Sequence, residues 1–158
     1  MGLRPHQMRV LPTDDHWRLR PGTVTAAARA DRGAGLVPFA VCASAGSTNT
    51  GAVHPLAALA DVCAADGLWL HVDAAYGGFA ALTPQGRALL AGIERADLVT
   101  VDPHGWLLQP LDCGGVLLRD GARLTCCDIA EYALIQPMRS GSHTTRRSSV
   151  TARCAFTP

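Results

Sequence analysis

The feature that most constrains the fold of this chain is an alternation of short apolar segments with longer segments of helical periodicity. Apolar segments bounded by turn residues predict strands at 8–11, 37–43, 68–73, 98–101 and 115–118. Helices are predicted between them, from Pro21 to near Gly33, from Pro55 to Gly67 and over 84–93. Strands that alternate with helices pair in parallel through right-handed crossovers. The pattern therefore predicts an α/β domain with a mostly parallel sheet and flanking helices.

Three of these segments carry further structural information. The strands at 37–43 and 68–73 are almost continuously apolar, which is typical of strands covered on both faces. The helix that begins at Pro55 has apolar residues at positions i, i+3, i+4 and i+7, which predicts one buried stripe. These residues are Leu56, Leu59, Ala60 and Cys63.

Composition excludes several classes of protein. The 158 residues fit one domain, with 48% hydrophobic residues, 17% charged residues and a formal net charge of +1. This charge gives no field that would attract nucleic acid or an anionic membrane, so we expect neither partner. The apolar runs are far shorter than the ~20 residues of a membrane-spanning helix. The first residues lack an apolar signal segment, and we therefore expect a cytoplasmic location.

The six cysteines do not have the spacing of a metal site. They contain no C-x-x-C pair, and the adjacent Cys126 and Cys127 do not match zinc spacing. We interpret the cysteines as small buried thiols in a reducing compartment and predict no metal site.

Polar residues lie at the ends of the predicted strands, where ligands of parallel sheets bind. Asp73 ends the motif His-Val-Asp and is followed by Ala74 and Ala75, and a later motif runs from Asp102 through His104 to Trp106. Together with Gly46, Ser47 and Thr48, these motifs resemble the group II pyridoxal-phosphate-dependent amino-acid decarboxylases. That family includes aromatic-amino-acid, histidine, glutamate and diaminobutyrate decarboxylases. The resemblance runs from about Met8 to Arg119.

The resemblance implies a fold and an assembly. It implies part of the large domain of the aspartate-aminotransferase-like, fold type I enzymes, over residues 1–120. Residues 121–158 are expected to form a divergent, loosely ordered tail, although 124–135 has the pattern of a helix. An amino-acid substrate, pyridoxal 5′-phosphate and a homodimer are implied by the same resemblance.

The resemblance also implies a role for each matching residue. Asp73 matches the carboxylate that pairs with the protonated pyridine nitrogen, which the cofactor needs in order to accept electrons. Ala75 matches the small residue against one face of the ring, and Thr48 matches a loop threonine at the cofactor. Asp102 and His104 match positions around the phosphate end. The alternative for Thr48 is a turn hydroxyl that bonds its own backbone, and the site is the favoured interpretation. His71 is predicted to be a hydrogen-bonded core histidine.

The chain departs from the family pattern at one position above all. The family has a lysine where this chain has Gly105, and all fourteen basic residues of the chain are arginine. No side-chain amine is present to form the Schiff base, so we predict no catalytic residue and a catalytically silent chain. Segments that would hold the cofactor phosphate and form the small domain are also expected to be missing. A smaller departure is His54, where an aspartate usually caps the helix.

Three interpretations of function remain open. The chain is a fragment or remnant of a decarboxylase, or it is a pseudoenzyme that pairs with an intact paralogue. A hydrolase that uses Cys113 with His104 and Asp102 or Asp112 is disfavoured, because the sequence contains no nucleophile elbow.

Overall fold

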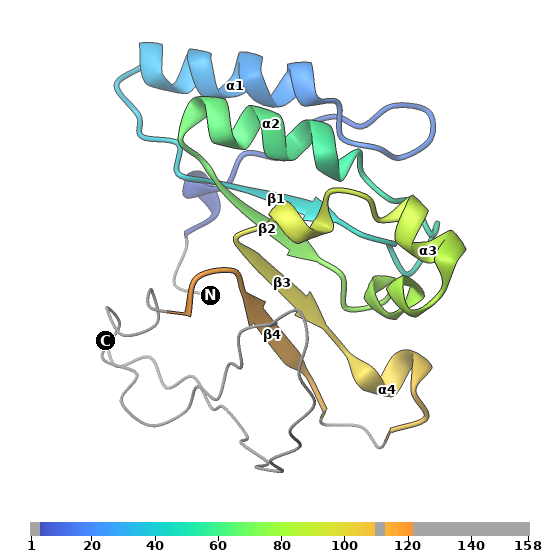
Figure 1. Cartoon of the computed structure of the whole chain (residues 1–158). Helices are drawn as coiled ribbons and strands as arrows, with labels where there is room; N and C mark the ends of the chain where they lie inside the picture. The colour runs from blue at the N-terminus through green and yellow to red at the C-terminus, as the bar shows by residue number, and fades with distance from the viewer. Residues whose placement is uncertain (1–3, 110–112, 122–158) are drawn as a thin grey trace. The chain divides into compact units, whose positions relative to one another are not determined.

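The computed structural model describes residues 4–109 and 113–121 (Figure 1). Residues Val10–Arg119 form one compact unit, while Met1–Arg9 and Asp120–Pro158 group separately. The first unit contains the sheet and its helices, and in the second a 3-10 helix, η1 (Pro5–Gln7), is described. The tail expected from residue 121 and the helix expected at 124–135 fall almost wholly outside the described residues.

Four strands form one sheet in the order β1-β2-β3-β4. The strands are β1 (Ala40–Ser44), β2 (Trp69–Asp73), β3 (Leu98–Val101) and β4 (Gly115–Leu118). The first three pair in parallel, and β4 runs antiparallel to β3. The predicted α/β class with a mostly parallel sheet is confirmed, and only the direction of β4 differs from purely parallel pairing. The connection before β4 contains the four-residue helix α4 (Pro103–Trp106), which is too short to serve as a crossover helix.

Helix α2 (Leu56–Asp66) packs on β1 and β2, and α1 (Pro21–Gly33) packs against α2 (Figure 1). The predicted stripe of α2 is confirmed, since Leu56, Leu59, Ala60 and Cys63 are all buried. Gly67 ends the helix in the left-handed conformation, with φ of 63°. Each fully buried leucine stabilises the fold by about 1.5–3 kcal/mol relative to an exposed one.

The segment predicted as a single helix over 84–93 is divided. Helix α3 covers Pro84–Leu89, and 3-10 helices lie on either side of it, η2 (Gly78–Leu82) and η3 (Ile93–Arg95). Thr83 begins α3 by accepting a hydrogen bond from the Gly86 N–H at 3.0 Å. Between α3 and η3 the chain turns through Gly92, whose φ is 97°.

The two faces of the sheet differ in burial. Ala43, Leu70, Val72 and Val99 are buried beneath the helices. We call the opposite face the open face because its side chains are exposed or partly exposed. It is formed by Cys42, His71, Asp73, Thr100 and Val116. The prediction that β1 and β2 are covered on both faces is therefore wrong for the part of the chain that is described, because side chains alternate between the faces.

Two strand predictions near the start of the chain need correction. No strand forms at 8–11, and Val10 in that segment is exposed. The strand predicted at 37–43 begins only at Ala40, because Val37 and Phe39 lie exposed before the pairing with β2 starts. Apolar character alone did not decide these bounds, since a strand also needs a neighbour to pair with.

Candidate functional site

The candidate site lies at the edge of the sheet where β1, β2 and β3 end. Pairing aligns Ser44, Asp73 and Thr100 in one row across these strands. The Asp73 side chain is exposed, and its Oδ1 accepts hydrogen bonds from the Ala75 N–H at 3.1 Å and the Thr100 hydroxyl at 3.3 Å. Both bonds use the same carboxylate oxygen. The arrangement fixes the orientation of a negative charge at the end of β2.

Close backbone contact brings the loop after β1 to this carboxylate. The Ala45 N–H donates to the Asp73 carbonyl at 2.8 Å. Gly77 lies against the same loop, and a Cβ atom added to it would be 2.1 Å from the Ala45 carbonyl oxygen and 2.9 Å from the Gly46 Cα. Only glycine at position 77 lets the two loops approach this closely.

Thr48 lies exposed in the loop that follows Gly46. The loop is closed by hydrogen bonds from the Gly46 and Ser47 N–H groups to the Ala52 carbonyl, both at 3.1 Å. The Thr50 hydroxyl bonds the Ser47 hydroxyl at 2.6 Å and accepts from the Ala52 N–H at 3.2 Å. Thr50 therefore has the turn role that was considered for Thr48.

Asp102 and His104 lie at the end of β3. The Asp102 N–H donates to the Ala75 carbonyl at 3.3 Å, which joins this strand end to the loop after Asp73. Helix α4 follows Asp102, and His104 within it forms a 3.1 Å hydrogen bond between Nδ1 and the Cys113 carbonyl oxygen. Because a carbonyl only accepts, Nδ1 is the donor there. His104 thus meets the backbone of Cys113, which gives no support to the hydrolase interpretation.

An aromatic pair joins the same two segments. The rings of Tyr76 and Trp106 meet edge to face, with their centroids 6.1 Å apart. Trp106 therefore anchors its loop through this ring contact. The contact places the helix that contains Gly105 beside the loop that follows Asp73.

Gly105 is exposed, and a Cβ added to it would meet no atom within 4 Å. Its backbone is also outside the left-handed region that favours glycine. The position therefore has room for a longer side chain. It lacks an amine, and no steric obstacle explains that absence. Since every basic residue of the chain is arginine, no lysine elsewhere can supply an amine.

Two groups on the open face report on the electrostatics of the site. The pKa of the Cys42 thiol is raised, first by its partial burial and then by the negative charge of Asp73. His71 differs from the prediction of a hydrogen-bonded core histidine, because its buried Nδ1 has no hydrogen-bond partner among the described residues.

The cysteines only partly match the prediction of buried thiols. Cys42 and Cys113 are exposed, whereas Cys63 is buried as expected.

Sequence reasoning missed Thr100 and misassigned His54. Thr100 is a polar residue in the otherwise apolar strand β3, and that exception was the signal that could have marked it. His54 was expected to cap α2, but that helix has Pro55 at its N-cap and no side-chain cap hydrogen bond. The His54 ring instead accepts a hydrogen bond from the Ser44 N–H at 3.1 Å.

The site fits a protonated pyridine ring in one respect and not in another. A fixed, exposed carboxylate suits a cationic ring nitrogen, and the small Ala75 beside it leaves space. No residue fits the covalent attachment that a lysine would provide. Within the described ranges, three or more His, Cys, Asp or Glu side chains nowhere gather so as to hold a metal ion. None of the helices in these ranges has the length and apolar character to cross a membrane.

Comparison with known proteins places these motifs in a family. The sequence model of the pyridoxal-dependent decarboxylase conserved domain matches residues 2–145, further in both directions than the expected 8–119. Aromatic-L-amino-acid decarboxylase of Bacillus atrophaeus is 45% identical over 125 residues, which are 79% of this chain and 26% of that protein. Histidine decarboxylase of Homo sapiens is 43% identical over 118 residues, which are 75% of this chain and 18% of the relative.

Solved structures give the same result. The crystal structure of Oryza sativa TDC with PLP and tryptamine has a TM-score of 0.74 and 44% identity, and the match covers 79% of this chain and 26% of that one. Mouse CSAD in apo form has a TM-score of 0.71 and 45% identity, with 73% and 24% covered. The chain spans about a quarter or less of the length of these relatives. From these matches and the ordered motifs at the strand ends, the chain belongs to the pyridoxal-dependent decarboxylase family.

Proposed function

We propose that this chain forms the ring-binding part of a pyridoxal-phosphate-dependent amino-acid decarboxylase and that it is catalytically silent because Gly105 replaces the attachment lysine. The observation that carries the proposal is the Asp73 carboxylate, which the Ala75 N–H and the Thr100 hydroxyl hold at the end of β2. Family membership and the motifs around Asp73 and Gly105 support the assignment. The substrate class is an amino acid.

Each site residue then has a defined task. Asp73 would keep the ring nitrogen protonated, and Ala75 would leave room for the ring. Thr48, on the loop held against Gly77, would lie at the cofactor. Asp102 and His104 would hold the phosphate end, for which the second imidazole nitrogen of His104 is available because Nδ1 bonds the Cys113 carbonyl. When bound, pyridoxal phosphate supplies an electron sink for the carbon that loses carbon dioxide.

The missing amine limits what these residues can do. Lysine in such a site forms the covalent link to the cofactor aldehyde and moves protons during the reaction. The exposed Gly105 does neither, and the chain contains no lysine at any position. We therefore expect reversible, noncovalent cofactor binding and no release of carbon dioxide from amino acids.

Borohydride reduction in the presence of pyridoxal phosphate tests this proposal. Peptide mass spectrometry should find no phosphopyridoxyl adduct within the wild-type chain and an adduct at position 105 in Gly105→Lys. Adding Asp73→Asn to that variant should lower the yield. Gly33→Lys is the matched control, because Gly33 in α1 is equally open but distant in sequence from the motifs. An internal adduct in the wild-type chain, decarboxylation by it, or equal labelling of both lysine variants would contradict the proposal.

A second candidate function is a pseudoenzyme subunit that pairs with an intact decarboxylase paralogue or with a second copy of itself. Exposed apolar side chains before β1 and on β4 favour it, with Val37 85%, Phe39 58% and Val116 47% exposed. Co-expression with a tagged full-length paralogue should yield a complex of defined mass. A monomer that stays soluble and alone at micromolar concentration would contradict this candidate.

A further inference from the structure

His54 makes two hydrogen bonds to one residue at the end of β1. Its backbone N–H donates to the Ser44 carbonyl at 2.9 Å, and its ring Nδ1 accepts from the Ser44 N–H at 3.1 Å. His54 is partly buried. One histidine therefore satisfies both backbone polar groups of Ser44.

These bonds occupy the outer side of an edge strand. β1 is first in the sheet order, so only its other side pairs with β2. Successive residues of a strand direct their N–H and C=O groups to opposite sides. Ala45 donates toward β2 through its bond to the Asp73 carbonyl, and Ser44 is therefore directed outward to His54. His54 takes the place of a neighbouring strand at this point.

The same contact holds the loop that contains Thr48. An isolated antiparallel bridge pairs Ala45 with Val53, and the Gly46 N–H bonds the Ala52 carbonyl. The loop thus leaves β1 at Ala45, returns at Val53 and is fixed by His54. Its first residues are also those packed on Gly77, next to Asp73.

The ring can make this bond in only one charge state. An imidazole nitrogen accepts a hydrogen bond only when it carries no proton, and in the imidazolium ion both nitrogens are donors. The Ser44 N–H is a donor as well, so protonation of Nδ1 would set two donors against each other. The bond therefore requires a neutral His54.

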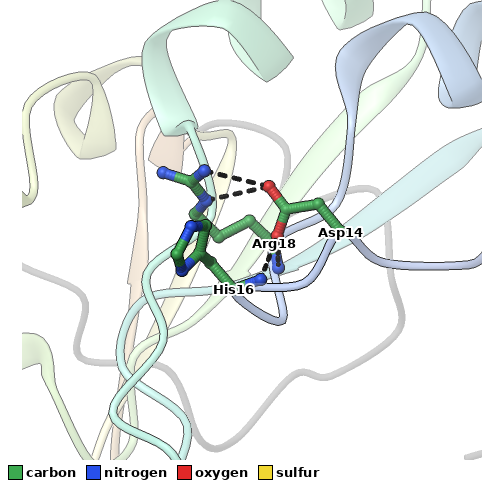
Figure 2. Close-up of polar contacts among 3 residues, drawn as sticks. All are labelled: Asp14, His16 and Arg18. Carbon is green, nitrogen blue, oxygen red and sulfur yellow. Dashed lines mark hydrogen bonds and ion pairs between the residues drawn. The ribbon is translucent and has the colours of Figure 1, made fainter.

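Charged groups near His54 come from the loop before α1. Asp14 closes that loop by accepting from the backbone N–H groups of His16 and Arg18, both at 2.9 Å, and from the Arg18 side chain (Figure 2). The Arg18 backbone N–H is the largest cause that lowers the pKa of Asp14 to about 2, so this carboxylate stays charged while a histidine titrates. Its negative charge acts on His54 and is partly balanced by its ion pair with Arg18. The first turn of α2 contains no acidic residue.

Burial nevertheless has the larger effect on the ring. It lowers the pKa of His54 from its ordinary value of 6.5, against the opposing effects of a backbone hydrogen bond with Trp17 and the charge of Asp14. A histidine whose pKa is lower in the folded state stabilises the fold above the unfolded value. That contribution is lost as the pH falls from about 6.5 toward the folded value.

We propose that neutral His54 is a lock that fixes the Thr48 loop on the end of β1, and that protonation of its ring opens the lock. The loop then leaves the position in which it packs on Gly77, and the row formed by Ser44, Asp73 and Thr100 loses its outer support. The edge of the sheet that holds the candidate site is thereby pH-dependent. This inference concerns the apo chain and does not depend on the proposed function.

Amide hydrogen exchange of the full chain tests the lock. After correction for intrinsic rates, the Ser44 amide should lose about tenfold protection between about pH 7.5 and about pH 5, as expected for one lost hydrogen bond. His54→Asn is the central variant, because Asn places an oxygen near Nδ1 that accepts at every pH. Its Ser44 protection should not change over this range. His16→Asn is the matched control on an exposed histidine and should behave as wild type.

Nitrogen-15 NMR spectra of the imidazole rings test the inference independently and need no variant. At about pH 7.5 the Nδ1 signal of His54 should be that of an unprotonated nitrogen. A proton on Nδ1 at this pH would overturn the inference even if His54→Asn failed to fold. The inference would also fail if the Ser44 amide lost as much protection at low pH in His54→Asn as in wild type. It would fail as well if the wild-type Ser44 amide kept its protection after the His54 ring is protonated.

Discussion

The face of the sheet beneath α2 and the open face are built from the same strands, yet they contain different kinds of residue. Leu70 and Val72 of β2 point to the covered face and are buried, whereas His71 and Asp73 alternate with them on the open face. The covered face makes apolar contacts, and the open face presents an imidazole and a carboxylate. Because successive side chains of a strand point to opposite faces, residues that stabilise this fold alternate along β2 with residues available for chemistry.

The largest expected effect separates two neighbours on β2. Leu70→Ala should lower the free energy of unfolding by about 2–5 kcal/mol, because Leu70 is 1% exposed and its removal leaves a cavity. His71→Ala should lower the free energy of unfolding much less, because its ring is partly exposed and Nδ1 has no hydrogen-bond partner within the described residues. Urea unfolding of both variants measures the difference, and equal losses would show that the open face is covered in solution.

The next effect concerns the contact between the loops at the site. Gly77→Ala should destabilise the fold by about 1–3 kcal/mol, because its methyl group would be 2.1 Å from the Ala45 carbonyl oxygen and the loops would have to separate. Gly22→Ala in α1 is the matched control, and it should be neutral or stabilising since nothing lies within 4 Å of its added Cβ. Thermal unfolding followed by circular dichroism compares the two. A neutral Gly77→Ala would mean that the loops are not in contact.

The smallest expected effect on stability lies on the open face itself. Thr100→Val removes the hydroxyl that bonds Asp73 while keeping the shape of the side chain, and it should change the free energy of unfolding by no more than about 1 kcal/mol. It should nonetheless weaken binding of pyridoxamine 5′-phosphate, measured by ligand fluorescence, and Thr100→Ser should restore binding. A Thr100→Val variant that loses stability but keeps its affinity for pyridoxamine 5′-phosphate would show that Thr100 serves stability, as the residues of the covered face do.

Much of the fold could be predicted because it depends on local pattern. The stripe of α2 and its stop at Gly67 follow from helical spacing and from the conformational freedom of glycine. Strands β3 and β4 have the predicted bounds, since turn residues limit them on both sides. The motif around Asp73 marked the candidate site because its residues lie within one short segment.

The remaining features depend on contacts between residues far apart in the sequence. The bond from Thr100 to Asp73 spans 27 residues and exists only because β2 and β3 pair in this register. The role of His54 depends on the end of β1, ten residues earlier, which a helix-capping pattern could not indicate. The direction of β4 and the exposure of the open face likewise depend on how elements pack and not on their own composition.

The open geometry at Gly105 has a practical consequence for anyone who handles this protein. A chain without lysine carries no side-chain amine, so an amine-reactive dye or crosslinker has only the α-amino group as its target. Installing one lysine at position 105, which is exposed and has free space around its Cβ, would create a single side-chain amine beside Trp106, which contacts Tyr76. The same change that tests for lost chemistry would thus equip the molecule with a site-specific probe.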